Sequence, residues 1–484
     1  MVRSSGSASV ADARQSASVE WVRQALKRYD AVLEDPVIAR ASNEILLNGQ
    51  RAMGISMHGR PVARSLRPRL IGAVDHAWVS VVSSVLAGAL QRLANFALDD
   101  GELGDRARSV LAPHPLELAL AKRAPRLGQA GSFSRLDAFF GDDRRLRFVE
   151  YNAHSPVGPM TQDALVEIYH RTPAMQEFIR QDRVHSTTTG PQYAEALLHA
   201  WERGGAPGGE PRVAVVECLP TKFGWEFTML ADRLRGMGVA ALLCSMDDLR
   251  YDPVEGLHVR ADDGGVWKIS VVHRRADMSD LITRYGIEFV EHPLTRAWTA
   301  GACVILNPLT TSFANKKSVF ALANDPELSA ILSHEEKATA DRHLPWTALV
   351  GPGTTSHEGD QVDLLDFAQA RRDSLVLKPN DDYGGNNVIC GWDTTDGDWK
   401  AALQAATRQP YVLQERVSIP QADYPFWKDG QAETVTYQES TDPCLIDSTT
   451  QVSICRLSQT SKINISAGGQ CLPIFQLSAP RDLL

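Results

Sequence analysis

The chain has 484 residues, of which 43% are hydrophobic and 23% charged, and its formal net charge is −9. This length and composition are typical of a folded protein with two or three domains. The acidic balance and the lack of a basic block argue against a nucleic-acid binder, so we expect small-molecule partners. The seven cysteines form no C-x-x-C pair, which favours free thiols in a reducing cytoplasm over a zinc site.

The N-terminal third is predicted to be mostly helical. Residues 1–18 contain no apolar stretch of the kind found in signal peptides, and we expect a disordered tail there. From Val19 to Leu120, apolar residues recur with a spacing near 3.6. The most apolar window, Trp78 to Leu98, also contains a glutamine, an arginine and an asparagine, which fits an amphipathic core helix better than a membrane span. These helices could form a homodimer face.

A β-hairpin is predicted over residues 133–152, around a Gly-Asp-Asp turn. Its second strand carries Glu150 and Asn152, which share one face because strand side chains alternate. A carboxylate and an amide oxygen side by side suit a hard cation such as Mg²⁺, although they could equally form a polar face in water. Arg135 in the first strand could contact a substrate carboxylate or phosphate, or lie at the surface.

A second domain is predicted to follow a linker rich in Thr, Gly and Pro over residues 185–211. Strands and helices then alternate up to Pro308, which predicts an open α/β sheet of Rossmann-like type. No G-x-G-x-x-G follows the first strand, so we assign no dinucleotide site and do not expect an NAD-dependent enzyme. This domain is expected to shape a substrate pocket.

The stretch from Leu375 to Trp392 predicts a strand, a glycine-containing turn and a second strand. Lys378 ends the first strand, and the turn contains two aspartates and the run from Gly384 to Asn387. Such a hairpin can present backbone N–H groups to phosphates, with Lys378 as the countercharge and an aspartate for Mg²⁺. Alternatively, the Asp, Gly and Asn residues only make the turn.

Three further segments could complete a nucleotide site. Lys316 or Lys317, which open a helical stretch, could supply a second ammonium to a phosphate or be solvated. The predicted strand over residues 411–417 offers backbone groups to an adenine ring, and Glu415 offers a carboxylate to its amino group or to a ribose. The C-terminal strands and glycine turns contribute polar residues, among them Arg456, Asn464 and Gly468.

Together, these segments resemble the ATP-grasp superfamily, and within it the circularly permuted branch of eukaryotic-type glutathione synthetases. The family's hairpin, L-K-P-x-x-E-G-G-G-N-N, is matched without a gap by LKPNDDYGGNN, and its E-I-N strand is matched by EYN. Its adenine strand, Y-I-L-M-E-K-I, is similar to YVLQERV, its Arg-x-Asp to RLD at residues 135–137, and its tail to CRLSQTSKINISAGG. The EYN strand precedes the lysine hairpin, which is the order expected of the permuted branch.

The resemblance implies a circularly permuted ATP-grasp fold of the α/β (α+β) class. A helical N-terminal region with the E-x-N hairpin would span residues 19–200, and an inserted Rossmann-like substrate domain would span residues 211–308. Residues 309–484 would form the nucleotide-binding region with its glycine-rich lid. The five matching segments lie between Arg135 and Gly469, and the first 120 residues do not align.

The resemblance also implies a role for individual residues, grouped here by what they would bind. The Mg²⁺ ligands would be Glu150, Asn152 and Asp382. The phosphate contacts would be Lys378, one of Lys316 and Lys317, and the turn formed by Gly384, Gly385, Asn386 and Asn387. The adenine pocket would be formed by Gln414, Glu415 and Val417. The substrate or acylphosphate contacts would be Arg135, Ser155, Arg456, Asn464 and Gly468, with Arg135, Lys378 and Arg456 as the catalytic cations.

The implied activity is ATP- and Mg²⁺-dependent ligation of a carboxylate to an amine through an acylphosphate, with an amino acid or short peptide as substrate and no nucleic-acid or membrane partner. Two alternatives stay open: an ATP-grasp phosphotransferase and a non-catalytic nucleotide-binding protein. Asp382 replaces the family's glutamate and Tyr383 its first loop glycine, so the acid and the amine are not identified. His154 lies beside the metal strand, where we expect a structural or solvated role.

Overall fold

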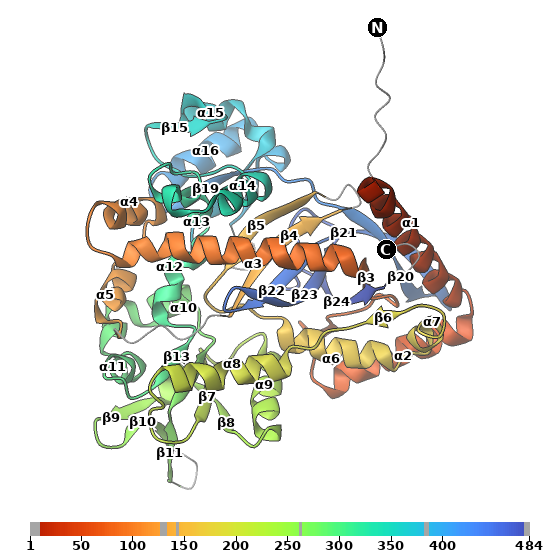
Figure 1. Cartoon of the computed structure of the whole chain (residues 1–484), viewed down its shortest axis with the longest axis horizontal. Coiled ribbons are helices and arrows are strands. Elements are labelled where there is room, and N and C mark those ends of the chain that lie inside the picture. Colours follow the sequence, from red (N-terminus) through yellow and green to blue (C-terminus); the bar gives the residue numbers. More distant parts are fainter. Residues whose placement is uncertain (1–9, 126–132, 142–144, 261–263, 382–386, 479–484) are drawn as a thin grey trace.

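The computed structural model describes residues 10–125, 133–141, 145–260, 264–381 and 387–478, with side chains from residue 19 onward (Figure 1). The chain forms a mixed α/β structure with three main sheets. Within the described residues, the predicted hairpins and the alternating α/β segment are all found. The candidate site lies where the three main sheets meet.

The largest sheet has nine strands and contains the predicted E-x-N hairpin. Its main path runs β20-β21-β23-β22-β4-β5, and β24 pairs with β23, β3 and β6. In the hairpin, Arg135 pairs with Asn152 and Asp137 with Glu150, so all four residues lie near one another at the end of the sheet that β5 forms. The strands are β3 (Arg69–Gly72), β4 (Phe133–Phe140), β5 (Leu146–Asn152), β6 (Val184–His185), β20 (Gln421–Lys428), β21 (Gln431–Glu439), β22 (Asp442–Ile446), β23 (Thr449–Ser458) and β24 (Gln470–Leu477).

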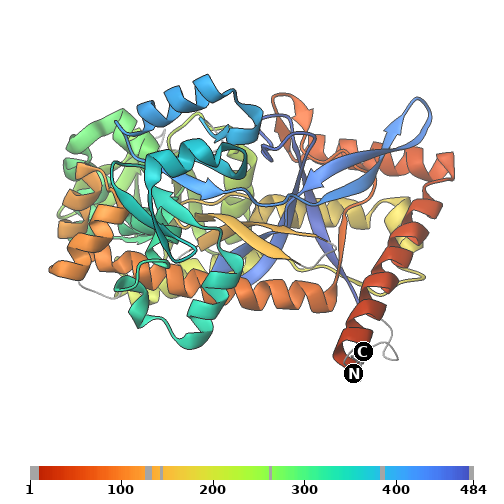
Figure 2. The ribbon, with the colours of Figure 1, turned by 90° about the horizontal axis from the view of Figure 1, so that it is seen from above.

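Helices from the N-terminal third pack on this sheet. The long helix α3 (Ala73–Asn95) runs along it and contacts β22, β23 and β24 (Figures 1 and 2). With the short turn after it, α3 is long and apolar enough to cross a membrane by length and composition alone. Val79, Leu86 and Leu90 are, however, buried in the protein core, so α3 is the core helix that the sequence predicted.

The remaining N-terminal helices are α1 (Val10–Val32), α2 (Pro36–Ala52), α4 (Glu102–Leu111) and α5 (Pro115–Arg123), and α6 (Pro159–His170) and α7 (Pro173–Phe178) follow the hairpin. Strands β1 (Ser56–Met57) and β2 (Arg60–Pro61) form a small ladder. The prediction of a disordered tail over residues 1–18 is wrong for residues 10–18, where α1 has already begun. That stretch contains no Gly or Pro and is rich in alanine, which favours a helix.

The second sheet is parallel, with the strand order β13-β12-β7-β8, and matches the predicted Rossmann-like segment. Its strands are β7 (Arg212–Glu217), β8 (Ala240–Ser245), β12 (Val271–Arg274) and β13 (Val304–Leu306), and its helices include α9 (Gly224–Gly236), α10 (Met278–Tyr285) and α11 (Pro293–Thr299). A three-stranded antiparallel sheet of β9 (Arg250–Asp252), β10 (Gly256–Arg260) and β11 (Val266–Ile269) is attached to it.

The predicted linker over residues 185–211 contains a helix, α8 (Gly190–Arg203). Its apolar side chains Tyr193 and Leu197 share a core with Val213 and Val215 of β7. The parallel-sheet domain therefore begins near residue 190 rather than at residue 211. Of the Gly and Pro residues that suggested a linker, Gly190 and Pro191 begin the helix, and the others follow it in residues 204–211.

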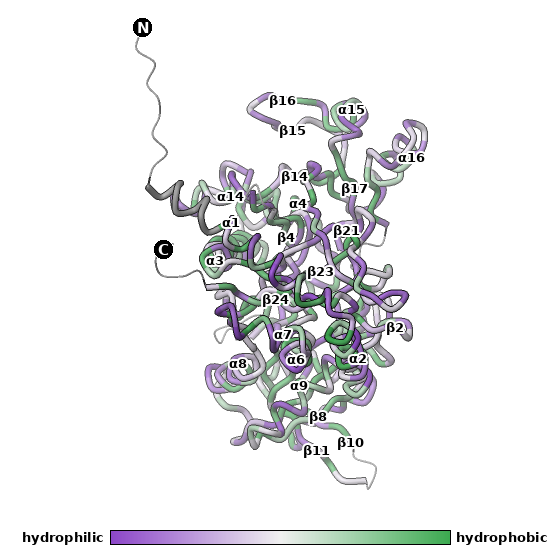
Figure 3. The backbone as a smooth tube through the Cα atoms, turned by 90° about the vertical axis from the view of Figure 1, so that its right-hand side faces the viewer, coloured by the Kyte–Doolittle hydropathy of each residue, from purple (hydrophilic) through white to green (hydrophobic). Residues whose placement is uncertain are grey.

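The third sheet, β14-β19-β17-β18, contains the predicted lysine hairpin and adenine strand. Lys378 of β17 pairs with Val412 of β19. The hairpins β15–β16 and β10–β11 lie at opposite ends of the molecule (Figure 3). The elements of this region are α12 (Ser312–Asn315), α13 (Val319–Leu322), α14 (His334–His343), β14 (Thr347–Leu349), β15 (Thr354–His357), β16 (Asp360–Asp363), α15 (Leu364–Ala370), β17 (Leu375–Pro379), β18 (Ile389–Cys390), α16 (Asp396–Ala406) and β19 (Tyr411–Glu415).

Candidate active site

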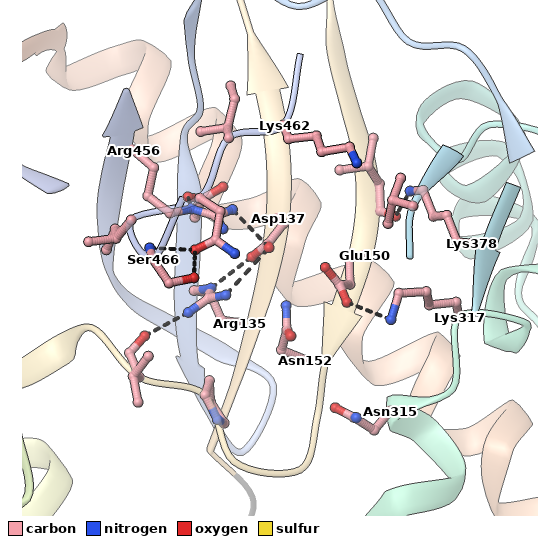
Figure 4. Close-up of a pocket in the computed structure, with 18 of the residues that line it drawn as sticks. Arg135, Asp137, Glu150, Asn152, Asn315, Lys317, Lys378, Arg456, Lys462 and Ser466 are labelled. Carbon is pink, nitrogen blue, oxygen red and sulfur yellow. Dashed lines mark hydrogen bonds and ion pairs between the residues drawn. The ribbon is translucent and has the colours of Figure 1, made fainter. Parts of the chain in front are cut away.

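A cavity of about 490 Å³ lies where the three sheets meet. Its walls come from the β4–β5 hairpin, from strands β17 and β19, from the loop after β23, and from the segments that follow β7 and β12. Figure 4 shows charged side chains of the β4–β5 hairpin, of β17 and of β23 with the loop after it lying around a common space, together with Lys317. The cavity therefore brings together segments that are far apart in the sequence.

The predicted metal-binding face lies on one wall of the cavity. Glu150 and Asn152 both line it, as expected from their alternation along β5. The Lys317 ammonium lies 3.1 Å from Glu150 Oε1, and Asn152 Nδ2 is buried without a hydrogen-bond partner among the described residues. Asn315 Oδ1 accepts a hydrogen bond of 3.0 Å from the Ala153 N–H and fixes the end of the strand. This wall thus offers a carboxylate and a side-chain amide whose hydrogen-bonding capacity is not fully used.

The oxygen donors of this wall fit Mg²⁺, which is commonly held by one or two carboxylates together with substrate phosphates and water. Among the described residues, no group of three or more His, Cys, Asp or Glu side chains gathers as a metal site. The third predicted ligand, Asp382, lies outside the described residues, as do Gly384, Gly385 and Asn386. Asn387 is described and does not line the cavity.

Lys378 points into the cavity from β17 and is partly buried. Its ammonium donates to Gln414 Oε1 at 2.6 Å and to the Val149 carbonyl at 3.1 Å. Burial lowers the pKa of Lys378 to about 8, Glu150 favours the charged form, and the Lys317 charge opposes it. This lysine is therefore a cation whose charge depends on pH in the neutral to weakly alkaline range.

The structure separates the two lysines that the sequence left as alternatives. Lys317 lines the cavity, whereas the Lys316 side chain is fully buried outside it. The Lys316 ammonium lies 2.6 Å from Glu117 Oε2 and 2.5 Å from Asp381 Oδ1. Lys316 is thus part of a buried ion-pair network, and Lys317 is the lysine placed to contact a ligand.

The C-terminal end of β19 and the residues that follow it form the third predicted subsite. Gln414, Glu415 and Val417 all line the cavity, with the apolar side chains of Val376, Trp392 and Ile419 nearby. The Gln414 amide bridges Lys378 and the Thr347 hydroxyl, to which Nε2 donates at 3.1 Å. The Glu415 carboxylate lies 2.8 Å from His357 Nε2 of the β15–β16 hairpin, so this side chain is already engaged.

Arg135 and Arg456 line the cavity but share buried carboxylates. Asp137 contacts Arg135 Nε at 2.7 Å and Arg456 Nη2 at 2.8 Å, and Arg456 Nε donates to Asp442 Oδ2 at 2.7 Å (Figure 4). Burial alone would raise the pKa of Asp137, but the two guanidinium charges outweigh it and hold the pKa at about 2. The predicted substrate cations are therefore part of a four-residue charge network. The sequence motif contained Asp137 but did not indicate that it pairs with both arginines, and it gave no sign of Asp442.

The other predicted substrate residues are divided between two cavities. Ser155 and Asn464 line the main cavity, and Ser155 Oγ donates to Asp277 Oδ2 at 3.3 Å. Gly468 does not: it lines a separate cavity of about 280 Å³. The difference arises because the loop after β23 forms a wall between the two cavities, and Ile465 lines both of them.

Sequence reasoning missed a charged group at the end of the cavity formed by the parallel sheet. Glu217 ends β7, and Arg275 and Asp277 follow β12; all three line the cavity. Burial raises the pKa of Glu217 to about 7. Arg275 Nη2 donates to the Ser155 carbonyl at 2.9 Å, and its Nε is buried without a hydrogen-bond partner among the described residues. Their position at the carboxyl ends of parallel strands, where open α/β sheets bind ligands, was the available signal.

His154 has a structural environment, as the sequence analysis expected. Its ring is fully buried, and Nδ1 lies 3.0 Å from the Thr311 hydroxyl and 2.9 Å from Arg274 Nη2. Burial and the Arg274 charge lower the pKa of His154 well below its usual range. The ring does not line the cavity, so we assign it no chemical step.

Comparisons with known proteins were made for sequence and for structure. No family model matches the chain. It is 28% identical over 265 residues to a Frankia alni protein that carries the name glutamate–cysteine ligase 2-3, and 29% identical over 261 residues to a Frankia casuarinae protein named glutamate–cysteine ligase 2-2. Each match covers 52% of this chain and only 27% of the relative.

Among solved structures, the chain is similar to the apo form of a glutathione synthetase-like effector from Globodera pallida. The TM-score is 0.60 at 15% sequence identity, and the similarity covers 92% of this chain and 99% of that one. At this identity the likeness concerns the fold. It agrees with the resemblance found in the sequence motifs, and we conclude that the chain shares the fold of this glutathione synthetase-like effector.

Proposed function

We propose that this protein is an ATP- and Mg²⁺-dependent carboxylate–amine ligase that joins a small amino acid or short peptide to an amine. One observation carries the proposal: Lys317, Lys378 and the Glu150–Asn152 face share a single cavity with the C-terminal end of β19. Two cations, a hard-cation face and an apolar strand end are the parts needed to bind a nucleoside triphosphate. The names of the Frankia relatives support the ligase class.

In the proposed reaction, the acid's carboxylate oxygen attacks the γ-phosphorus, ADP leaves, and an acylphosphate forms; the amine then displaces phosphate to give the amide. Lys317 and Lys378 would bind phosphate oxygens and offset their charge. Arg456 and Arg135 lie farther along the cavity, where the acyl group and departing phosphate would sit. Bound Mg²⁺ would supply additional charge neutralisation at Glu150 and Asn152. Enclosing walls would limit hydrolysis of the acylphosphate.

We also propose that the acid is bound at the parallel-sheet end of the cavity. Arg275 has a buried, unpartnered N–H there among the described residues, which suits a carboxylate, while Glu217 and Asp277 offer negative charge to an ammonium group. A molecule with both groups, such as an amino acid, would match this end. The circularly permuted arrangement remains part of the proposal and is supported by the chain order, in which β5 precedes β17.

The test is product analysis with purified full-length protein, Mg²⁺-ATP and panels of amino acids and amines. A ligase releases ADP at an appreciable rate only when both the acid and the amine are present, and an amide product appears in equal amount. ADP release with a single acceptor and a stable phosphorylated product would instead indicate the phosphotransferase alternative. Nucleotide binding without turnover of any pair, while calorimetry shows a site lost in Lys317→Ala, would favour the non-catalytic alternative.

A further inference from the structure

The buried Lys316 has no contact with the cavity, yet it lies next to Lys317 in the sequence and contacts the segment that follows Lys378. We propose that Lys316 is a positioning residue: with Asn380, it holds Lys317 and Lys378 at a fixed spacing and thereby sets the affinity for nucleotide phosphates without touching them. This inference rests on the proposed function, because it assumes that the two lysines bind phosphates.

The first support is the ion-pair network of Lys316. Its ammonium connects two distant segments, Glu117 of α5 at 2.6 Å and Asp381, directly after β17, at 2.5 Å. Glu117 Oε2 also accepts the His114 N–H at 2.7 Å, so the carboxylate is itself fixed at the start of α5. If the ammonium moved to a phosphate, the Glu117 carboxylate would remain buried without its counterion, which is strongly unfavourable. Lys316 is thus placed to hold the base of the glycine-containing turn.

The second support is Asn380, which is fully buried and hydrogen-bonded in four directions. Its carbonyl accepts the Lys317 N–H at 3.1 Å, and its Oδ1 accepts the Ser318 N–H at 2.9 Å. Its Nδ2 donates to the Leu111 carbonyl at 2.8 Å, and its own N–H donates to the Pro410 carbonyl at 3.0 Å. The backbone that carries Lys317 is therefore bound directly to a residue two positions after Lys378.

These contacts define which property Lys316 should control. A polyphosphate has to contact Lys317 and Lys378 together, and charge-assisted hydrogen bonds are sensitive to small displacements of their donors. The C-terminal end of β19, which would contact the base, is held by pairing with β14 as well as with β17 and does not depend on the Lys316 ion pairs. Loss of the ion-pair network should weaken the binding of phosphates and leave the binding of the nucleoside unchanged.

The experiment measures dissociation constants for Mg²⁺-ADP and for adenosine by calorimetry on the full-length chain. The variants are Lys316→Met, Asp381→Asn and the conservative Asp381→Glu; Lys337→Ala, which removes an exposed ion pair with Asp341 on α14, is the control. We expect Asp381→Asn to weaken ADP binding at least fivefold and adenosine binding less than twofold, with Asp381→Glu restoring most of the ADP affinity. Lys316→Met should show a larger effect of the same kind.

If Lys316→Met does not fold, Asp381→Asn alone tests the inference. This variant should fold, because the Asp381 side chain is 42% exposed and its replacement leaves the Lys316–Glu117 ion pair in place. Equal weakening of ADP and adenosine would show a general structural role and overturn the inference, as would unchanged ADP affinity in the folded variants. In both cases wild-type ADP binding would leave the proposed function standing. A wild-type protein that binds neither ligand would refute the nucleotide site and this inference with it.

Discussion

Replacing Lys378 by methionine should weaken nucleotide binding and also remove most of its dependence on pH. The ammonium of Lys378 donates to Gln414 Oε1 and to the Val149 carbonyl, and burial lowers its pKa from 10.5 to about 8. A phosphate binds the charged form of this lysine. Above pH 8, the empty protein must therefore take up a proton when the nucleotide binds, and the apparent affinity falls.

The size of both effects follows from the structure. A hydrogen bond between charged groups contributes about 1.5–3 kcal/mol, so Lys378→Met should raise the dissociation constant at pH 7 roughly 10- to 150-fold. With a pKa of about 8 in the empty protein, Lys378 is mostly charged at pH 7 and mostly neutral at pH 9. The wild-type dissociation constant should therefore rise about tenfold, or about 1.4 kcal/mol, between pH 7 and pH 9. Nucleotide phosphates are ionised over this range, since their second pKa is near 6.

The assay is calorimetric titration of Mg²⁺-ADP into the wild type and Lys378→Met at pH 7, 8 and 9. The exposed Lys400 on α16 supplies a matched control, Lys400→Met, which should behave as the wild type does. A wild-type dissociation constant that stays the same from pH 7 to pH 9 would refute the argument that Lys378 loses its proton in this range. An equal slope in Lys378→Met would assign the proton uptake to another group.

Three other variants test the charge networks of the cavity. Asp137→Asn should lower the free energy of unfolding at pH 7 by about 3–5 kcal/mol in urea titrations, because Arg135 and Arg456 lose a shared buried carboxylate. In the wild type, the stability that the ionised Asp137 carboxylate contributes is fully present above pH 3.8. It should disappear as the pH falls through the folded pKa of about 2. Glu217→Gln should be more stable than the wild type at pH 8, by at most about 3 kcal/mol, because the wild-type carboxylate, with its raised pKa of about 7, is then ionised in a buried site. At pH 4 that carboxyl group is neutral, and the two proteins should be equally stable. A difference in melting temperature that is the same at both pH values would contradict this. Glu150→Gln should remove most of the gain in ADP affinity that Mg²⁺ gives the wild type. The ADP affinity measured in EDTA should not fall, because phosphates no longer have to displace the Glu150 carboxylate from Lys317, and a clear loss of affinity in EDTA would contradict this.

Local pattern was enough to predict several of the strands that carry site residues, and one face of the site. Apolar runs located β7 and β17, and the two-residue period of β5 placed Glu150 and Asn152 side by side. These features depend only on residues close in the sequence, because side chains along a strand alternate between its two faces. The helix α8 was missed for the opposite reason: its place on β7 and β13 depends on tertiary packing, which overrides the loop-like composition around it.

Residue roles that depend on distant partners were not predictable from the sequence. Nothing near Lys316 in the chain indicates that Glu117 pairs with it, since the two residues are brought together only by folding. Likewise, the aspartates that pair with Arg456 lie on β4 and β22. A motif identifies which residue types are present, but only the packed structure shows which of them are already neutralised by a partner.

This pairing bears directly on how the cavity could bind an anionic ligand. In the structure, the Lys317 ammonium contacts Glu150 and the Lys378 ammonium donates to Gln414, so each cation already has a partner that a ligand would displace. Binding of an anionic ligand would then exchange one partner of each lysine for another, rather than supply a partner to an unpaired lysine. Under the proposed function, phosphate oxygens would replace Glu150 at Lys317 while Mg²⁺ replaces Lys317 at Glu150. Because the two exchanges leave no charge unpaired only when they occur together, nucleotide and Mg²⁺ should each strengthen the binding of the other.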